Sequence, residues 1–255
     1  MKAIKPYFFA KASKKAQAAL RSLSSIYKCF SLNDSNVIVV LGGDGSILSL
    51  INHKIFLKKK IYGMNRGTLG FLLNNYSEEN LFKRIKEAKI YRLNPVSMKV
   101  RDIKDREYNA LSLNEVSLFR QNRFAANLRV KINDNIKIKK LVCDGILVST
   151  PAGSTAYNLS AHGPILPINS SLLALTPICP FRPRRWKGAL IPEKSKITLE
   201  VLNYKDRPVS ATAGEVEIRN VRSVEVECDF SKPLKLLFDN EQNLEERVFN
   251  EQFIL

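Results

Sequence analysis

The stretch that decides the fold is VIVVLGGDGS, residues 37–46. Its first five residues are apolar and mostly β-branched, which is typical of a buried strand. Three glycines follow, and glycine lets the main chain turn sharply and approach a ligand closely. We predict that Ser46 caps a helix from Ile47 to about residue 58, whose free N–H groups face the same point. The pattern therefore predicts a strand, a turn and a helix that together bind an anion.

Asp44 stands inside this predicted anion site, where a carboxylate repels phosphate. A carboxylate in that place fits a chemical role. It can accept the proton of a hydroxyl that attacks a phosphate, or it can help to hold Mg²⁺. A turn rich in glycine and aspartate also follows strands without binding anything, so this segment alone leaves both interpretations open.

The composition of the 255 residues, 45% hydrophobic and 25% charged, is ordinary for a soluble protein of one large or two modest domains. No apolar run is long enough for a membrane helix, and the apolar stretch near the N-terminus is too short for a signal peptide. Four dispersed cysteines without a C-x-x-C pair favour reduced thiols. We therefore expect a cytoplasmic protein with no membrane partner.

The formal net charge of +17 permits polyanionic partners such as nucleic acids, membrane surfaces or phosphorylated metabolites. The lysines are scattered, however, and the sequence has neither zinc-finger spacing nor the aromatic run of an RNA-recognition domain. We therefore expect no specific nucleic-acid partner.

Strand and helix patterns alternate over the first 95 residues, which predicts a parallel sheet with helices on its faces. We expect strands at residues 4–9, 37–41 and 60–64, and helices at residues 13–23, 47–58 and 78–89, the last capped by Ser77. Ligands of such sheets bind at the carboxyl ends of the strands. A second glycine segment, GMNRGTLGF at residues 63–71, also falls at such an end.

Short alternating runs replace this pattern from about Val96, including a hairpin signature around residues 128–138 and runs at residues 197–201 and 224–228. We therefore predict a Rossmann-like parallel α/β domain followed by an antiparallel, sandwich-like β-rich domain. The boundary at Asn94-Pro95 divides the chain into residues 1–95 and 96–232. We expect the tail, residues 233–255, to pack back on the first domain.

Two clusters of polar residues stand in the second half. In LNEV, residues 113–116, an adjacent Asn and Glu need partners if the strand is central, although an edge strand would explain them equally. In CDGILVSTPAGSTAY, residues 143–157, a strand ends in a Pro/Gly turn, and we predict that Ser154 caps a short helix near Thr155. The amides, hydroxyls and aromatic face of this turn suit a nucleotide base and ribose. Asp144 can accept a hydrogen bond from an amide, or it is simply a turn residue.

Taken together, GGDG at residues 42–45, the pair Asn114-Glu115, and Asp144 with STAY at residues 154–157 resemble the NAD kinase family in order and spacing. Gly-Gly-Asp-Gly alone is shared with diacylglycerol-type lipid kinases and phosphofructokinases, so the specificity lies in the combination. The resemblance implies transfer of the γ-phosphate of ATP to the 2′-hydroxyl of the adenosine ribose of NAD, giving NADP. It implies Mg²⁺ held mainly through the phosphates rather than by a protein metal site, and a homodimer or homotetramer. Whether polyphosphate can replace ATP stays open.

The resemblance also assigns roles by position. Asp44 becomes the catalytic base, and phosphates are lined by Gly42, Gly43, Gly45 and Ser46. Asn114 contacts the adenine, Glu115 a ribose hydroxyl, and Asp144 the nicotinamide end. The adenine pocket is shaped by Thr155, Ala156 and Tyr157, with Ser160 nearby.

Three departures from the family pattern stand out, one of them His162, which stands where glycine is common. Ser46 stands where many members have Thr, and Ala213-Gly214 stands where many have Asp-Gly. Two other functions remain alternatives: a lipid kinase that uses the basic surface on anionic membranes, and a nucleotide- or nucleic-acid-binding module without catalysis.

Overall fold

The apolar run at residues 37–41 forms the predicted strand, β2 (Val37–Gly42), all of whose residues are buried. In the computed structural model, which describes residues 3–52 and 54–253, β2 lies parallel to β1 (Pro6–Ala10) and β3 (Lys60–Asn65). The register sets Ala10 beside Leu41 and Gly42 beside Asn65, so the carboxyl ends of the three strands share one edge of the sheet.

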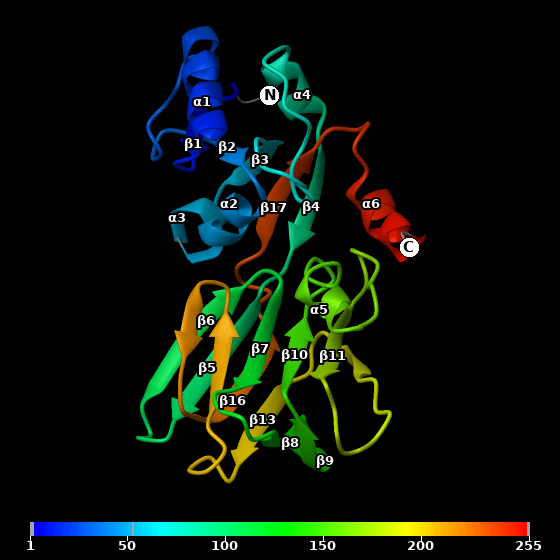
Figure 1. The fold of residues 1–255 in the computed structure, drawn as a ribbon. Helices are drawn as coiled ribbons and strands as arrows, with labels where there is room; N and C mark the ends of the chain where they lie inside the picture. The colour runs from blue at the N-terminus through cyan, green and yellow to red at the C-terminus, as the bar shows by residue number, and fades with distance from the viewer. Residues whose placement is uncertain (1–2, 53, 254–255) are drawn as a thin grey trace. The chain divides into compact units, whose positions relative to one another are not determined.

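This sheet has five strands in the order β1-β2-β3-β17-β4 (Figure 1). The strand β17 (Leu234–Phe238) is parallel to β3 and antiparallel to β4 (Lys89–Leu93). Asn74 joins β3 to β17, because its buried Nδ2 donates to the carbonyls of Gly63 and Leu237 at 3.0 and 2.9 Å. The strand β17 was not predicted from the sequence, although all of its residues stand in the tail, residues 233–255, that was expected to pack on the first domain.

The chain divides into two units, one of residues 3–93 and 232–247 and the other of residues 94–231 and 248–253. The first unit carries α1 (Lys14–Ile26) and α4 (Leu81–Glu87), together with most of α6 (Leu244–Asn250); the 3₁₀ helix η2 (Glu251–Phe253) follows α6. In α1, the Ser13 side chain accepts a hydrogen bond from the N–H of Ala16, and the helix buries Ala16, Ala19 and Leu23.

Two predicted helix starts in the first unit are wrong. The helix expected to begin at Ile47 begins at Asp44 as α2 (Asp44–Leu48), and Ser46 is a buried residue inside it rather than its cap. The extended Gly43 is the N-cap. Because Gly42 and Gly43 carry no Cβ, the main chain can turn directly from β2 into α2. The expected long helix is instead α2, the 3₁₀ helix η1 (Ser49–Asn52) and α3 (Lys54–Leu57), with residue 53 outside the described residues.

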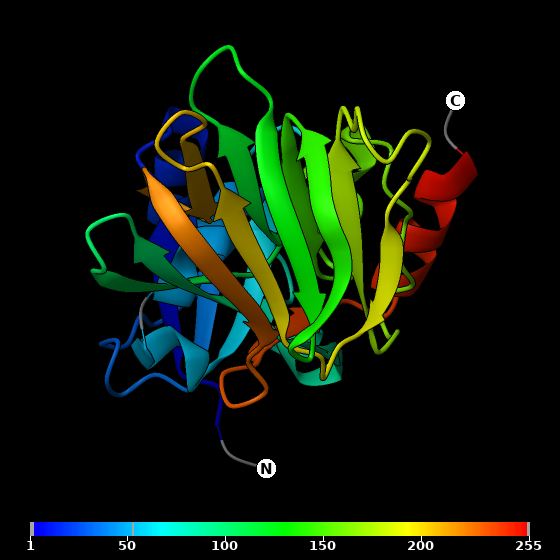
Figure 2. The ribbon, with the colours of Figure 1, turned by 90° about the horizontal axis from the view of Figure 1, so that it is seen from below.

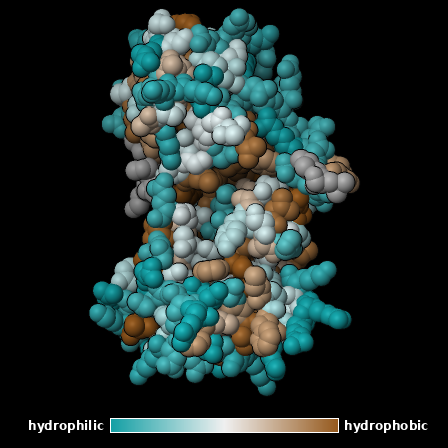
Figure 3. All heavy atoms as spheres, in the orientation of Figure 1, coloured by the Kyte–Doolittle hydropathy of each residue, from teal (hydrophilic) through white to brown (hydrophobic). Residues whose placement is uncertain are grey.

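The second wrong start is that of α4. It follows Asn80, which has a left-handed φ of 53°, and it begins four residues after Ser77. The Ser77 hydroxyl accepts instead from the N–H of Glu79 in the preceding loop. Hydrophilic side chains dominate the surface over α4 (Figure 3).

The second unit is a sandwich of two six-stranded sheets (Figure 2). One sheet contains β6 (Glu107–Ser112), β5 (Val96–Asp102), β16 (Val221–Cys228), β13 (Ile197–Leu202), β8 (Ala126–Ile132) and β9 (Asn135–Cys143), in that order. The other contains β12 (Ala189–Pro192), β11 (Leu172–Ile178), β10 (Gly145–Ser149), β7 (Glu115–Arg120), β14 (Val209–Ala213) and β15 (Val216–Ile218). Alternate residues of both sheets form one buried core, so the predicted fold class, α/β followed by antiparallel β, is confirmed.

The four cysteines are free, and none of the helices within the described residues is long and apolar enough to cross a membrane.

Candidate active site

The carboxylate of Asp44 is held by main-chain groups of the second glycine segment. Its Oδ1 accepts the N–H of Leu72 at 2.7 Å, and its Oδ2 accepts the N–H of Phe71 at 2.9 Å. The structure therefore joins the two glycine segments at the carboxyl ends of β2 and β3. Each carboxylate oxygen keeps lone-pair capacity, so Asp44 can still accept a proton from a bound hydroxyl.

The glycines bring these two segments into main-chain contact. A Cβ added to Gly67 would lie 2.7 Å from the Cα of Gly43, and the N–H of Arg66 donates to the carbonyl of Gly42 at 2.8 Å. A Cβ added to Gly42 would lie 2.1 Å from the hydroxyl of Ser46. Packing therefore requires glycine at residues 42 and 67, whatever binds there.

Arg247 of α6 supports the same segment from its other side. Its Nη1 donates to the carbonyls of Gly70, Phe71 and Leu73, the last at 2.8 Å. Residues 70–73 thus give three of their carbonyls to Arg247 and two of their N–H groups to Asp44. Arg247 was not predicted from the sequence, because it stands far along the chain in a helix with no motif.

In the second unit, Glu115 is the first residue of β7 and Asn114 precedes it, and β7 lies between β10 and β14 rather than at an edge of its sheet. The edge-strand interpretation is therefore wrong. Asn114 Oδ1 and Glu115 Oε2 are buried and have no hydrogen-bond partner among the described residues. Burial raises the pKa of Glu115 to about 7. Buried acceptors without partners are costly, and a perturbed carboxyl is typical of a functional site.

The Pro/Gly turn after β10 packs directly on Asn114. The N–H of Thr150 donates to the Asn114 carbonyl at 2.8 Å, and a Cβ added to Gly153 would lie 2.2 Å from that oxygen. Thr150 also donates its hydroxyl to the carbonyl of Leu113 at 2.6 Å. This turn therefore fixes the main chain that carries Asn114.

The predicted cap at Ser154 is wrong. The short helix α5 (Tyr157–Ser160) follows Ala156, and the buried Ser154 hydroxyl donates to the carbonyl of Pro151 at 2.7 Å and accepts the N–H of Leu166 at 3.0 Å. Ser154 thus holds its own turn against the following loop. Thr155 and Ala156 are half-buried, and Tyr157 and Ser160 are exposed.

Asp144 does not lie with the rest of its sequence cluster. It precedes β10, whereas Glu115 pairs with Ser149 at the opposite end of that strand, about 15 Å away. Asp144 Oδ1 lies 2.6 Å from Nε of Arg120, the last residue of β7. The sequence analysis missed Arg120, and only the register of β7 against β10 could have found it.

The departure at Ala213 lies in a buried position. Ala213, the last residue of β14, pairs with Val116 of β7 and is 1% exposed. Because it packs in the apolar core of the sandwich, an aspartate at this position would need a partner that the alanine does not need.

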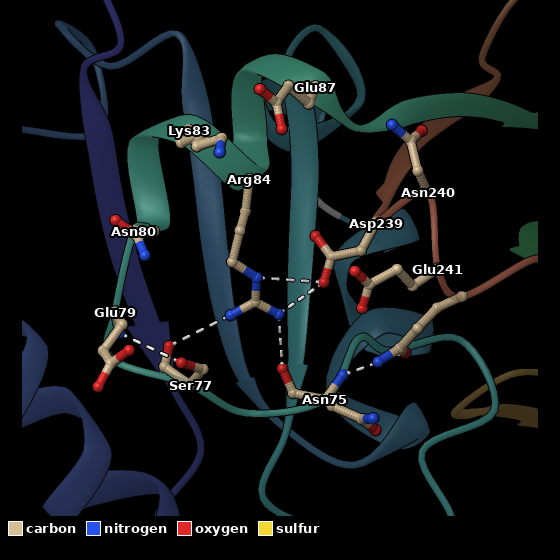
Figure 4. Close-up of a pocket in the computed structure, with 11 residues that line it drawn as sticks. Asn75, Ser77, Glu79, Asn80, Lys83, Arg84, Glu87, Asp239, Asn240 and Glu241 are labelled. Atoms are coloured by element: carbon tan, nitrogen blue, oxygen red, sulfur yellow. Dashed lines mark hydrogen bonds and ion pairs between the residues drawn. The ribbon is translucent and has the colours of Figure 1, made fainter.

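A cavity of about 480 Å³ lies elsewhere in the first unit (Figure 4). Arg84 of α4 forms an ion pair with Asp239 there, and the Tyr62 hydroxyl donates to the same carboxylate at 2.6 Å. None of the site residues predicted from the sequence lines this cavity.

Known proteins resemble the chain over most of its length. Residues 113–234 match the ATP-NAD kinase C-terminal domain. The NAD kinase of Caulobacter vibrioides is 48% identical over 238 residues, which are 93% of this chain and 92% of that protein. The NAD kinase of Hyphomonas neptunium is 45% identical over 246 residues, 96% of each.

Two solved structures share the fold. Yeast NADH kinase complexed with NADH gives a TM-score of 0.82 at 19% identity, over 99% of this chain and 88% of that one. An NAD kinase from Archaeoglobus fulgidus in complex with ATP gives 0.74 at 23% identity, over 97% and 98%. With curated relatives this similar over nearly the whole sequence, the chain belongs to the NAD kinase family.

Proposed function

We propose that this protein phosphorylates the 2′-hydroxyl of the adenosine ribose of NAD with ATP and so forms NADP. The observation that carries the proposal is the Asp44 carboxylate, which two main-chain N–H groups hold at the mouth of a glycine turn. Phosphoryl transfer needs positioning and charge stabilisation more than covalent help from the protein. A fixed carboxylate beside a turn without side chains supplies the positioning.

In the proposed reaction, Asp44 accepts the proton of the 2′-hydroxyl while that oxygen attacks the γ-phosphorus of ATP. The bond between the γ-phosphorus and the bridging oxygen breaks, and ADP leaves. The bonds from Phe71 and Leu72 fix the direction in which the carboxylate points. The phosphates lie along Gly42, Gly43, Gly45 and Ser46, where most positions carry no Cβ to exclude them.

The second unit supplies recognition of the dinucleotide in this proposal. The unpartnered oxygens of Asn114 and Glu115 accept from the adenine amino group and a ribose hydroxyl, which removes the cost of burying them alone. Thr155, Ala156 and Tyr157 border the adenine, with Ser160 beside them. Asp144, at the other end of β10, takes the nicotinamide end.

Magnesium fits this site mainly as a partner of the substrate. Among the residues that the structure describes, no group of three or more Asp, Glu, His or Cys side chains could hold a metal ion. Mg²⁺ prefers several oxygen ligands, and the ATP phosphates provide them. Bound there, the ion neutralises charge that develops during transfer.

ATP is proposed as the donor because the structurally similar Archaeoglobus fulgidus enzyme was solved in complex with ATP. Polyphosphate as an alternative donor, a homodimer or homotetramer, and a cytoplasmic location remain predictions.

The test is NADP formation by the purified protein with ATP, Mg²⁺ and NAD, detected through an NADP-specific dehydrogenase. Parallel reactions replace ATP with polyphosphate, and NAD with NADH or dispersed diacylglycerol. Turnover with NAD supports the proposal. Phosphorylation of the lipid without formation of NADP would overturn it in favour of a lipid kinase.

A further inference from the structure

Lys11 stands directly beside the glycine turn, at the end of the neighbouring strand. It follows β1, whose Ala10 pairs with Leu41, so residue 11 reaches the level of Gly42. A Cβ added to Gly45 would lie 3.9 Å from the Lys11 ammonium nitrogen. The ammonium group of the exposed Lys11 therefore lies near Gly45, the one glycine of the turn that is exposed.

The main chain at Lys11 is held in place although its side chain is exposed. Gln17 of α1 donates from Nε2 to the carbonyls of Ala10 and Lys11, at 3.3 and 3.1 Å. Arg66 connects the same region to the turn. Its side-chain Nε donates to the carbonyl of Lys15 at 3.4 Å, and its main-chain N–H donates to the carbonyl of Gly42 at 2.8 Å. These bonds fix the distance between the origin of the Lys11 side chain and the glycine turn.

Lys11 has no counter-charge within the part of the chain that the structure describes. None of the ion pairs there includes it, whereas Lys89, Lys131 and Lys196 are each paired with a carboxylate. A lysine that is aimed at a main-chain anion site and is not neutralised by the protein can pair with a phosphate.

The position of Lys11 also selects which phosphate it contacts. β1 and β3 flank β2 on opposite sides, and the Asp44 carboxylate is held by residues that follow β3. Lys11 follows β1. In an in-line transfer, the attacking and leaving oxygens lie on opposite sides of the transferred group. If the attacking hydroxyl is at Asp44, the leaving phosphates lie on the side of Lys11.

We infer that Lys11 binds the phosphate chain of the donor, and thereby assigns the β1 side of the turn to the donor and the β3 side to the acceptor. This inference rests on the proposed kinase function. It assigns Lys11 a contact with substrate, while Gln17 and Arg66 hold the main chain around it.

The test compares two equilibrium affinities by isothermal titration calorimetry, that for inorganic tripolyphosphate with Mg²⁺ and that for NAD. Lys11→Met removes the cation and keeps much of the side-chain length. We expect the tripolyphosphate affinity to fall about tenfold or more while the NAD affinity stays within about twofold. Lys14→Met is the matched control, because Lys14 is also an exposed lysine and lies on the first turn of α1. It leaves both affinities unchanged.

A second variant tests the place of contact. In Gly45→Ala the new Cβ meets only the Lys11 nitrogen, at an ordinary contact distance, so the fold accepts it. It should still weaken tripolyphosphate binding, because it fills the space between Lys11 and the turn. Lys11→Arg should restore part of the affinity that Lys11→Met loses.

Two results with Lys11→Met would overturn the inference: NAD binding weakened as much as tripolyphosphate binding, or both affinities unchanged. Failure of the unmodified protein to bind tripolyphosphate would overturn it as well. A protein that binds tripolyphosphate through Lys11 but forms no NADP from ATP and NAD would overturn the proposed function and leave the anion contact standing. The two failures are therefore distinguishable.

Discussion

The carboxylates of Asp44, in the glycine turn of the first unit, and of Glu115, in β7 of the second, have opposite surroundings. Asp44 has both oxygens bonded to main-chain N–H groups, whereas Glu115 Oε2 is buried with no partner among the described residues. The first arrangement fixes a group in place before a ligand arrives. The second leaves acceptors whose cost only a ligand can remove. Positioning for chemistry and recognition of a substrate thus call for different local energetics.

Asp44→Asn should have the largest effect. We expect kcat to fall by about 10²–10⁴-fold, because the amide cannot act as a base, while NAD still binds. The amide has only one oxygen, so its NH₂ group would face the N–H of either Phe71 or Leu72, and that N–H would lose its acceptor. Steady-state kinetics and NAD titration measure the two effects separately.

Asp134→Asn is the control for this loss, because Asp134 lies in the exposed β8–β9 hairpin of the other unit. If the Asp44 variant kept near-full kcat, the turn would serve binding only and the contrast between the two regions would fail.

Glu115→Gln should change how stability depends on pH. Burial raises the pKa of Glu115 from 4.5 to about 7, so between these values the folded protein holds a proton that the unfolded chain releases. The resulting stabilisation is complete below about pH 4.5 and is lost as the pH rises through 7, a change of up to about 3 kcal/mol. The variant lacks this loss, so its advantage over the unmodified protein should grow from pH 5 to 8.

Urea unfolding at several pH values measures the difference, with the half-exposed Glu217→Gln as the control. NAD should also bind the Glu115 variant more weakly, because a carboxylate accepts hydrogen bonds better than an amide. A stability difference that does not vary with pH would show that Glu115 is as well accommodated as Asp44.

Gly67→Ala tests whether main-chain contact holds the Asp44 turn. The new Cβ would lie 2.7 Å from the Gly43 Cα, so the segments must separate, at a cost of about 1–3 kcal/mol. The reverse variant, Gly43→Ala, puts its Cβ 3.6 Å from the Gly67 Cα, an ordinary contact, and should leave the melting temperature nearly unchanged. Equal melting temperatures for both variants would mean that the turn is not set by this contact.

Ser154→Ala should have the smallest effect, on stability alone. The buried hydroxyl donates to the carbonyl of Pro151 and accepts from the N–H of Leu166. Its loss leaves the Leu166 N–H without this partner, whereas the Pro151 carbonyl still accepts the N–H of Ser154 at 3.3 Å, so we expect a cost of about 1 kcal/mol. The exposed Ser160→Ala should change the free energy of unfolding by less than about 0.5 kcal/mol. If both variants unfolded alike, the turn under Asn114 would not depend on Ser154.

The sequence predicted what local pattern controls and missed what distant segments control. The strand at residues 37–41 and the hairpin around residue 133 were correct, because apolar run and turn chemistry both specify them. The strand β17 was missed: its five residues, LKLLF, are too few to distinguish strand from helix by periodicity.

The helix caps failed for a related reason. Ser46, Ser77 and Ser154 each stand where a cap is common, but Gly43, Asn80 and Ala156 occupy the cap positions. Two of these predicted caps failed because the Ser46 and Ser154 side chains are buried in the interior of the protein. Within the site, the sequence picked out Asp44 and the glycines. It could not show that Phe71, Leu72 and Arg247 hold them, since main-chain donors and a distant arginine have no motif.

The place of β17 in the first sheet has a consequence for synthesis of the protein. The ribosome completes β3 and β4 early, yet the strand that lies between them emerges only after the entire sandwich has been made. Until then β3 and β4 have unpaired edges, which nascent chains can expose to aggregation. A stop codon before residue 234 would therefore remove the strand that joins β4 to β3, and so divide the sheet beside Asp44, although Asp44 itself had been translated long before.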